Sequence, residues 1–185
     1  YFDFTANVKE FVVENAIGFI YLEGSNDSAR INYVLDKKVL VSESSLAQSE
    51  LNKIELRHSQ SADSLFSSIN FPAVPIGKYY CTMNLDVPNK KNIVINYPNE
   101  GVAASYLESD LFVETKNESC TVENHSGSLE AHSIGGNIVS VLGIPDSGFC
   151  KCYSVSGNIT IKIPIGSTAN IHLKSTTGTV SFNNL

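Results

Sequence analysis

Charged residues occupy only 17% of the 185 positions, and the chain holds no long apolar run and no large basic cluster. Its apolar runs fall short of the roughly 18 residues that a helix needs to cross a bilayer, so this segment is not expected to insert into a membrane. The largest basic clusters are Lys37-Lys38 and Lys90-Lys91, and the net charge is −6. Binding to a nucleic-acid backbone is therefore not expected.

Sequence signatures of catalysis are also missing. No Gly-x-Ser-x-Gly, His-Glu-x-x-His or phosphate-loop pattern occurs, and Cys150-x-Cys152 lacks the spacing of a redox or zinc motif. Four cysteines allow three complete pairings, but Cys81 and Cys120 stand at apolar positions where a free thiol packs as a small hydrophobe. The sequence leaves disulfides and buried thiols both open. It predicts no cofactor, no zinc site at the cysteines and no catalytic thiol.

A short phrase recurs between Cys120 and Phe182: a small residue, a glycine, a polar residue, and then apolar residues at alternating positions. Its four copies contain Gly127, Gly136, Gly157 and Gly178. The last three glycines are 21 residues apart, and a fixed period is typical of a chain that coils on itself. Each copy predicts a turn followed by a strand, with glycine supplying the positive φ of a tight turn. We expect the four glycines at equivalent corners of one repeating object.

A longer phrase of strand, proline, strand, glycine turn and strand occurs twice, from Met83 to Val102 and from Ile161 to Val180. Proline cannot donate to a strand ladder, so Pro88 and Pro164 are expected to end strands. The predicted fold is all-β, a solenoid of short parallel strands in a single domain over 1–185, with N-terminal strands and loops over 1–88 and regular repeats over 89–185. A β-sandwich is the alternative.

Two further segments have distinct patterns. Apolar and polar residues alternate most regularly from Tyr79 to Val87, which predicts a half-buried strand with Cys81, Met83 and Leu85 inward. A helix competes with a loop only over 42–50, where Ser45-x-x-Gln48 resembles a capping box. We expect a loop with at most one helical turn there.

The order of these motifs resembles the bacterial putative-adhesin domains of unknown function. The matching stretches are Phe11–Val13, Gly18–Ile20, Ile31–Tyr33, Val87-Pro88, Ile93–Ile95, Gly101-Val102, the Ser-Gly-x-Leu/Ile cycles, Ile163-Pro164, Ile171–Leu173 and Thr177–Val180. The resemblance covers nearly the full length and implies a right-handed, parallel β-helix-like solenoid in an exported protein. It brings no established catalytic or binding residues.

One local group has the chemistry of metal ligands. If Val122 and Leu129 face the core, strict alternation turns four potential ligands outward on consecutive strands, and these are Glu123, His125, Glu130 and His132. A β-surface displays such rows routinely, so we expect ordinary solvent-facing residues and no bound metal. His58 and His172 are also interpreted as surface residues.

The predicted function is that of an exported bacterial cell-envelope or surface protein of adhesin-like type, which binds a glycan or a protein through a rigid β-surface without catalysis. The chain begins at Tyr1 without an initiator methionine or a leader. This start suggests a removed export signal or lipid-anchor leader, and hence the periplasm, the outer surface or secretion.

Two alternatives stay open. One is a structural or accessory envelope module that self-associates into a homo-oligomer through open solenoid ends. The other is a polysaccharide-acting β-helix enzyme, for which Glu108, Asp110 and Glu114 form the nearest acidic group, with Lys116 as their one basic neighbour.

Overall fold

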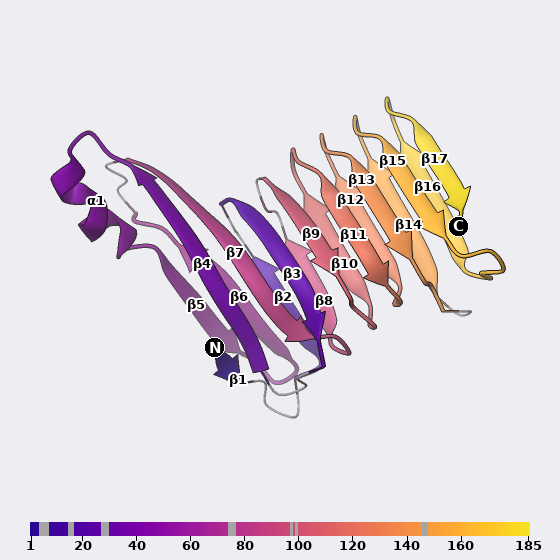
Figure 1. The fold of residues 1–185 in the computed structure, drawn as a ribbon, viewed down its shortest axis with the longest axis horizontal. Helices are drawn as coiled ribbons and strands as arrows, with labels where there is room; N and C mark the ends of the chain where they lie inside the picture. Colours follow the sequence, from indigo (N-terminus) through magenta and orange to yellow (C-terminus); the bar gives the residue numbers. More distant parts are fainter. Residues whose placement is uncertain are drawn as a thin grey trace.

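The computed structural model describes residues 1–3, 8–14, 17–26, 30–73, 77–96, 98, 100–145 and 148–185. Two sheets lie face to face along an elongated molecule (Figure 1). The nine-stranded sheet has the order β1 (Phe2–Asp3), β4 (Arg30–Leu40), β7 (Lys78–Pro88), β3 (Phe19–Ser25), β9 (Gly101–Ser105), β11 (Cys120–His125), β13 (Ile138–Leu142), β15 (Ile159–Ile163) and β17 (Val180–Asn184). The eight-stranded sheet has the order β16 (Asn170–Ser175), β14 (Phe149–Ser154), β12 (Leu129–Ser133), β10 (Leu111–Thr115), β8 (Asn92–Asn96), β2 (Glu10–Glu14), β6 (Ser64–Asn70) and β5 (Glu55–Gln60).

From β8 onward the chain alternates between the two sheets, and from β10 onward each strand pairs in parallel with the strand two places before it. Leu111 pairs with Leu129, 18 positions on, whereas Leu129 pairs with Cys150, 21 positions on. The all-β prediction is confirmed, and the pairing in this part is parallel as expected. The layering is that of a sandwich, the alternative that the sequence left open.

Two N-terminal strands, β2 and β3, lie between other strands inside the two sheets. β2 lies between β6 and β8, and β3 lies between β7 and β9, all in parallel pairing. β4 runs antiparallel to β7, and β5 runs antiparallel to β6, so the expectation of parallel strands is wrong for this end of the molecule. Because β2 pairs with β8, the core continues without a break across position 88.

One hydrophobic core fills the space between the sheets, from Val8 to Ile163. The alternation over 79–87 is confirmed, since Cys81, Met83 and Leu85 are buried. All four cysteines are free and buried, which answers the question that the sequence left open. Burial raises the pKa of Cys81 to about 11 and that of Cys120 to about 12, so these thiols stay protonated at neutral pH.

The expected loop near residue 45 is wrong, because residues Ser44–Leu51 form the helix α1. The helix N-cap is Glu43, without a side-chain cap bond, so the predicted capping box does not start it. A tertiary contact holds the helix instead. Glu50 is buried and accepts hydrogen bonds from the Tyr79 hydroxyl of β7 and from the Lys53 ammonium group.

All four repeated glycines lie at corners, but one of them lies at the opposite edge from the other three. Gly136, Gly157 and Gly178 lie between β12 and β13, β14 and β15, and β16 and β17, where the chain passes from the eight-stranded to the nine-stranded sheet. Gly127 lies between β11 and β12, at the opposite edge, so the prediction of four equivalent corners is wrong for it. None of the four has a positive φ. Glycine is required at these corners because neighbouring turns approach closely. A Cβ on Gly178 would lie 2.3 Å from the Gly157 carbonyl oxygen, and a Cβ on Gly127 would lie 2.0 Å from the Ser109 carbonyl oxygen.

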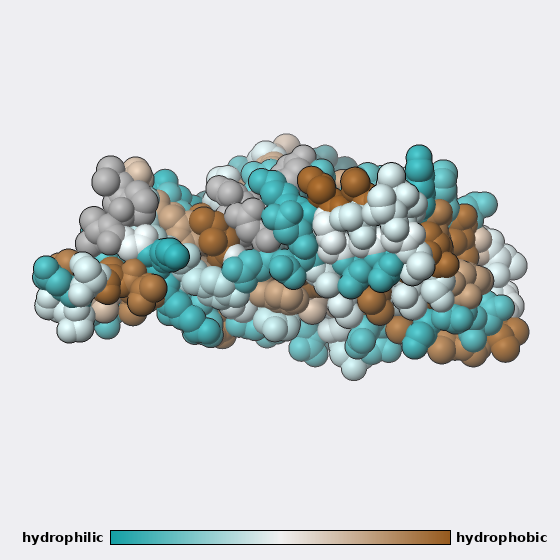
Figure 2. Space-filling model, turned by 90° about the horizontal axis from the view of Figure 1, so that it is seen from above, coloured by the Kyte–Doolittle hydropathy of each residue, from teal (hydrophilic) through white to brown (hydrophobic). Residues whose placement is uncertain are grey.

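The face of the molecule drawn in Figure 2 carries no continuous apolar belt. Figure 2 shows separate hydrophobic patches among hydrophilic and intermediate ones, several of them toward the C-terminal end. Within the described residues, no helix is long and apolar enough to cross a membrane.

Candidate functional site

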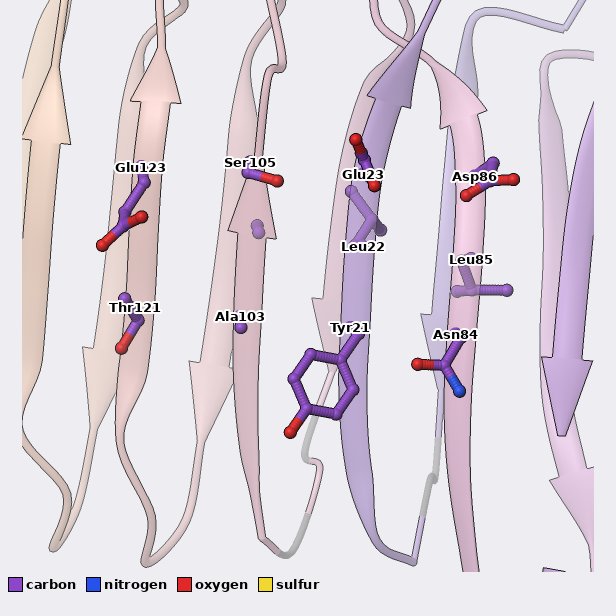
Figure 3. Close-up of a pocket in the computed structure, with 11 residues that line it drawn as sticks. Tyr21, Leu22, Glu23, Asn84, Leu85, Asp86, Ala103, Ser105, Thr121 and Glu123 are labelled. Atoms are coloured by element: carbon purple, nitrogen blue, oxygen red, sulfur yellow. The ribbon is translucent and has the colours of Figure 1, made fainter. Parts of the chain in front are cut away.

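A groove of about 310 Å³ lies on the outer face of the nine-stranded sheet, over the adjacent strands β7, β3, β9 and β11 (Figure 3). Its outward-facing side chains are Tyr21, Glu23, Asn84, Asp86, Ala103, Ser105, Thr121 and Glu123. The short side chains of Ala103 and Ser105 on β9 form the floor. β3 and β11 flank that floor and stand two strand spacings apart, or roughly 10 Å.

Strand alternation places these side chains on the outer face. On β3, Ile20 and Leu22 are buried while Tyr21 and Glu23 are exposed, and β7 alternates in the same way. Parallel register then aligns the outward residues into two rows across the strands. One row is Asn84, Tyr21, Ala103 and Thr121, and the other is Asp86, Glu23, Ser105 and Glu123.

Tyr21 is the aromatic wall of the groove, with 48% of its surface exposed. Its ring centroid lies 4.5 Å from that of Phe19, and a Cβ on Gly101 would lie 2.7 Å from the Phe19 ring. Phe19 therefore lies closely over Gly101 and supports Tyr21 from the side. In Figure 3 the Tyr21 ring leans from β3 toward Ala103, so one part of it faces the groove.

The groove is acidic. Asp86 and Glu23 are neighbours in register, and Glu123 stands on the far side of Ser105. Among the residues that the structure describes, no Lys, Arg or His lines the groove. Ionised carboxylates only accept hydrogen bonds, so this surface favours a ligand rich in O–H or N–H donors and repels an anion.

Comparison with known proteins gives the following likenesses. No protein-family model matches the sequence, and no curated protein matches it either. Among solved structures, a putative cell adhesion protein from Clostridium sporogenes is 10% identical, with a TM-score of 0.48, over 97% of this chain and 94% of that one. A putative adhesin from Bacteroides fragilis is 16% identical, with a TM-score of 0.35, over 99% of this chain and 95% of that one.

A third solved structure, described as a putative lipid binding protein from Parabacteroides distasonis, is 10% identical with a TM-score of 0.30, over 99% of this chain and 95% of that one. The chain is thus similar over nearly its full length to proteins described as putative adhesins, the group that the sequence motifs resemble.

The four candidate metal ligands do not come together. Glu123 lies in the groove of the nine-stranded sheet, whereas Glu130 and His132 lie on the outer face of the eight-stranded sheet. His132 Nε2 is 3.1 Å from Glu130 Oε1. Among the described residues, no group of three or more His, Cys, Asp or Glu is placed to hold a metal ion.

His125 contradicts the prediction that it faces outward, because it is fully buried. Asn124 has a φ of 50°, and the pairing of β11 with β13 shifts register between Val122 and His125. This bulge inserts one residue and turns the next side chain inward. His125 Nε2 lies 3.1 Å from the Ser128 carbonyl oxygen, to which it donates as the neutral ring. Burial lowers the pKa of His125 below its ordinary value.

The acidic group considered for an enzyme is dispersed as well. Glu108 lies at a corner, where its Oε1 accepts a hydrogen bond from Asn89 Nδ2 at 2.9 Å. Asp110 accepts one from the Ser128 backbone amide at 3.2 Å, and Glu114 lies on the outer face of the eight-stranded sheet. These three carboxylates do not face one common point.

Of the groove residues, only Glu123 was singled out from the sequence, and it was considered there as a metal ligand. Tyr21 and Asn84 are 63 positions apart, yet they are neighbours in register. Alternation on β3 and β7 is a signal that these side chains face outward. Their juxtaposition depends on β3 entering the sheet between β7 and β9, which one sequence does not reveal.

Proposed function

We propose that this protein is a non-catalytic, adhesin-like module of an exported surface or envelope protein, and that it binds a neutral or amino-bearing glycan in the groove of the nine-stranded sheet. The observation that carries the proposal is the exposed Tyr21 ring beside two rows of hydrogen-bonding side chains in fixed register. Ligand sites commonly combine an aromatic surface with a few well-placed polar groups.

The chemistry of the lining supports this ligand class. A sugar ring offers C–H groups that pack on an aromatic face and hydroxyl groups that donate to carboxylates. Tyr21 supplies the aromatic face, and Glu23, Asp86 and Glu123 supply the acceptors. Because the described lining of the groove holds three carboxylates and no cation, carboxylated and sulfated glycans are expected to be excluded.

The repeated architecture supports the remainder of the proposal. Strands that alternate between two sheets with a period of 18 or 21 residues suit a flattened β-solenoid, and parallel crossovers of this kind are generally right-handed. Such a scaffold holds rows of side chains rigidly, as a surface-binding protein requires. Export is proposed together with this role.

The second candidate function is that of a structural module that self-associates, and an exposed apolar edge strand favours it. β17 is an edge strand of its sheet, and its Val180 and Phe182 are 46% and 44% exposed, although they pair in register with the buried Ile159 and Ile161. An apolar edge of this kind can pair with a further strand.

The test is a glycan array followed by calorimetry on the leading neutral or amino-bearing glycan. We expect binding that falls at least tenfold in Tyr21→Ala and in Glu23→Gln. Tyr153→Ala, an aromatic truncation on the opposite sheet, is the matched control and should bind as the parent does. Circular dichroism of each variant shows whether the fold is retained.

Three outcomes distinguish the candidates. Glycan binding that is lost with Tyr21 supports the proposal. Oligomers that form with rising concentration, without glycan binding, support the structural module. Release of sugar products from a bound oligosaccharide would contradict the non-catalytic role.

A further inference from the structure

A second groove, also of about 310 Å³, lies on the outer face of the eight-stranded sheet, at the carboxyl ends of β10, β12, β14 and β16. One side is a row of outward residues in register, which are Glu114, His132, Tyr153 and Lys174. The other side follows the strand ends, where Ile134, Val155 and Thr176 stand one above another. Backbone hydrogen bonds between successive turns hold this second side, such as Val155 N to Ser133 O at 3.1 Å.

The middle of the groove is apolar and aromatic. Ile134 and Val155 are 57% and 51% exposed, and the ring centroids of His132 and Tyr153 are 5.0 Å apart. Exposed apolar side chains gathered inside a polar rim are typical of an interaction surface.

The floor offers few hydrogen-bonding groups to a ligand. Ser133 and Ser154 are buried, and their hydroxyl oxygens accept hydrogen bonds from the amides of Gly136 and Gly157, each at 2.8 Å. A ligand that fills the middle of this groove must therefore bind chiefly through apolar contact, unlike a ligand in the acidic groove of the other sheet.

Opposite charges stand at the two ends. Glu114 on β10 and Lys174 on β16 are separated by three strand spacings, or roughly 14 Å. Neither belongs to an ion pair in the described part of the chain. The charges between them are already matched, because Glu130 lies 3.6 Å from Lys151 Nζ and 3.1 Å from His132 Nε2. The two end charges are therefore available to a partner.

We propose that this groove binds an extended protein segment of about five residues, with apolar side chains in the middle and opposite charges at its ends. In an extended segment the first and fifth residues lie four rises of about 3.4 Å apart, which matches the distance from Glu114 to Lys174, and their side chains point to the same face. The basic end of the segment pairs with Glu114 and the acidic end with Lys174, while the apolar side chains pack between Tyr153 and Val155. This site is independent of the proposed glycan groove, which lies on the other sheet.

The test uses three fluorescent pentapeptides with blocked termini and the same Val-Leu-Val centre: one with Lys and Asp at its ends, one with two Asp, and one with two Lys. In fluorescence polarisation we expect the Lys/Asp peptide to bind at least tenfold more tightly than the other two. Chain direction does not affect this comparison, because a zwitterionic peptide can match both ends in either orientation.

Variants of the protein make the test specific. Lys174→Glu leaves two acidic ends and should shift the preference to the peptide with two Lys, whereas Tyr153→Ala and Val155→Ser should weaken all binding at least tenfold. Tyr21→Ala on the other sheet is the matched control. If the three peptides bind equally, if the Lys/Asp peptide does not bind at about 1 mM, or if Lys174→Glu leaves the preference unchanged, the proposal is wrong.

Discussion

A Cβ atom on Gly157 would lie 1.9 Å from the carbonyl oxygen of Gly136, one repeat earlier in the chain. Neighbouring turns thus approach so closely that no side chain fits between their backbones. The same close approach joins Gly127 to Ser109, 18 positions earlier, so it occurs at both repeat lengths.

Gly157→Ala is therefore expected to destabilise the protein, by about 2 kcal/mol or more, because the obstructing atom is backbone and the whole turn must shift. Gly143→Ala is the matched control, since its Cβ would meet only the His125 carbonyl oxygen, at 3.8 Å. Urea unfolding of both variants measures the difference. Equal free energies of unfolding for the two variants would show that the turn stacking is looser than described.

The sequence predicted the core better than the corners. Alternation identified Cys81, Met83 and Leu85 as inward-facing, because a strand has only two faces and the apolar residues select one. Gly127 shares the local phrase of the other glycines but lies at the opposite edge, since the same close packing occurs at both corners of a two-sheet coil. A local motif does not encode the edge on which it lies.

The site was less predictable than the core. His125 turns inward because Asn124 takes a left-handed backbone conformation, which the alternation rule does not anticipate. The acidic groove needs β3 to enter the sheet between β7 and β9, and β2 to enter beside β8. Such pairings between distant segments depend on the whole fold.

The carboxylates of the acidic groove should lower stability when no ligand is bound. Asp86 and Glu23 are direct neighbours in register, and like charges in that position are destabilising. We expect Asp86→Asn to raise the free energy of unfolding by roughly 0.2–1 kcal/mol at low salt, with a smaller gain at high salt because of screening.

The control for the effect of removing one negative charge is Glu55→Gln. Glu55 is exposed on β5, and its register partner on β6 is the uncharged Asn70. This substitution removes the same charge without relieving a like-charge neighbour in register. Urea unfolding at two salt concentrations compares the pair. A gain in Glu55→Gln as large as that in Asp86→Asn would attribute the effect to net charge alone.

His125 should make the protein less stable as the pH falls. Burial lowers the pKa of the folded imidazole below 6.5, so the unfolded chain binds a proton more readily than the folded one. The contribution is fully present above a pH of about 6.5 and is lost as the pH falls toward the folded pKa. We expect wild type to lose more stability than His125→Gln between about pH 7.5 and pH 5. Parallel pH profiles for the two proteins, or an NMR titration of His125 above 6.5, would contradict this assignment.

Two buried serines should respond in opposite ways to loss of the hydroxyl group. Ser154 Oγ accepts a hydrogen bond from the Gly157 amide at 2.8 Å and lies 3.4 Å from the Gly136 carbonyl oxygen, so it ties two successive turns together. Ser140 is equally buried, but its hydroxyl group has no hydrogen-bond partner among the described residues.

Ser154→Ala leaves a buried amide unsatisfied, which costs about 1–3 kcal/mol. Ser175 holds Gly178 in the same way but is only half-buried, so Ser175→Ala should cost less. Ser140→Ala removes a buried polar group that makes no bond, and it should be neutral or stabilising. Both changes delete the same atom from a buried strand residue, so the difference in their free energies of unfolding isolates the bond to the turn. A destabilisation of equal size in both variants would mean that packing of the hydroxyl oxygen, rather than its hydrogen bonds, stabilises the corner between β14 and β15.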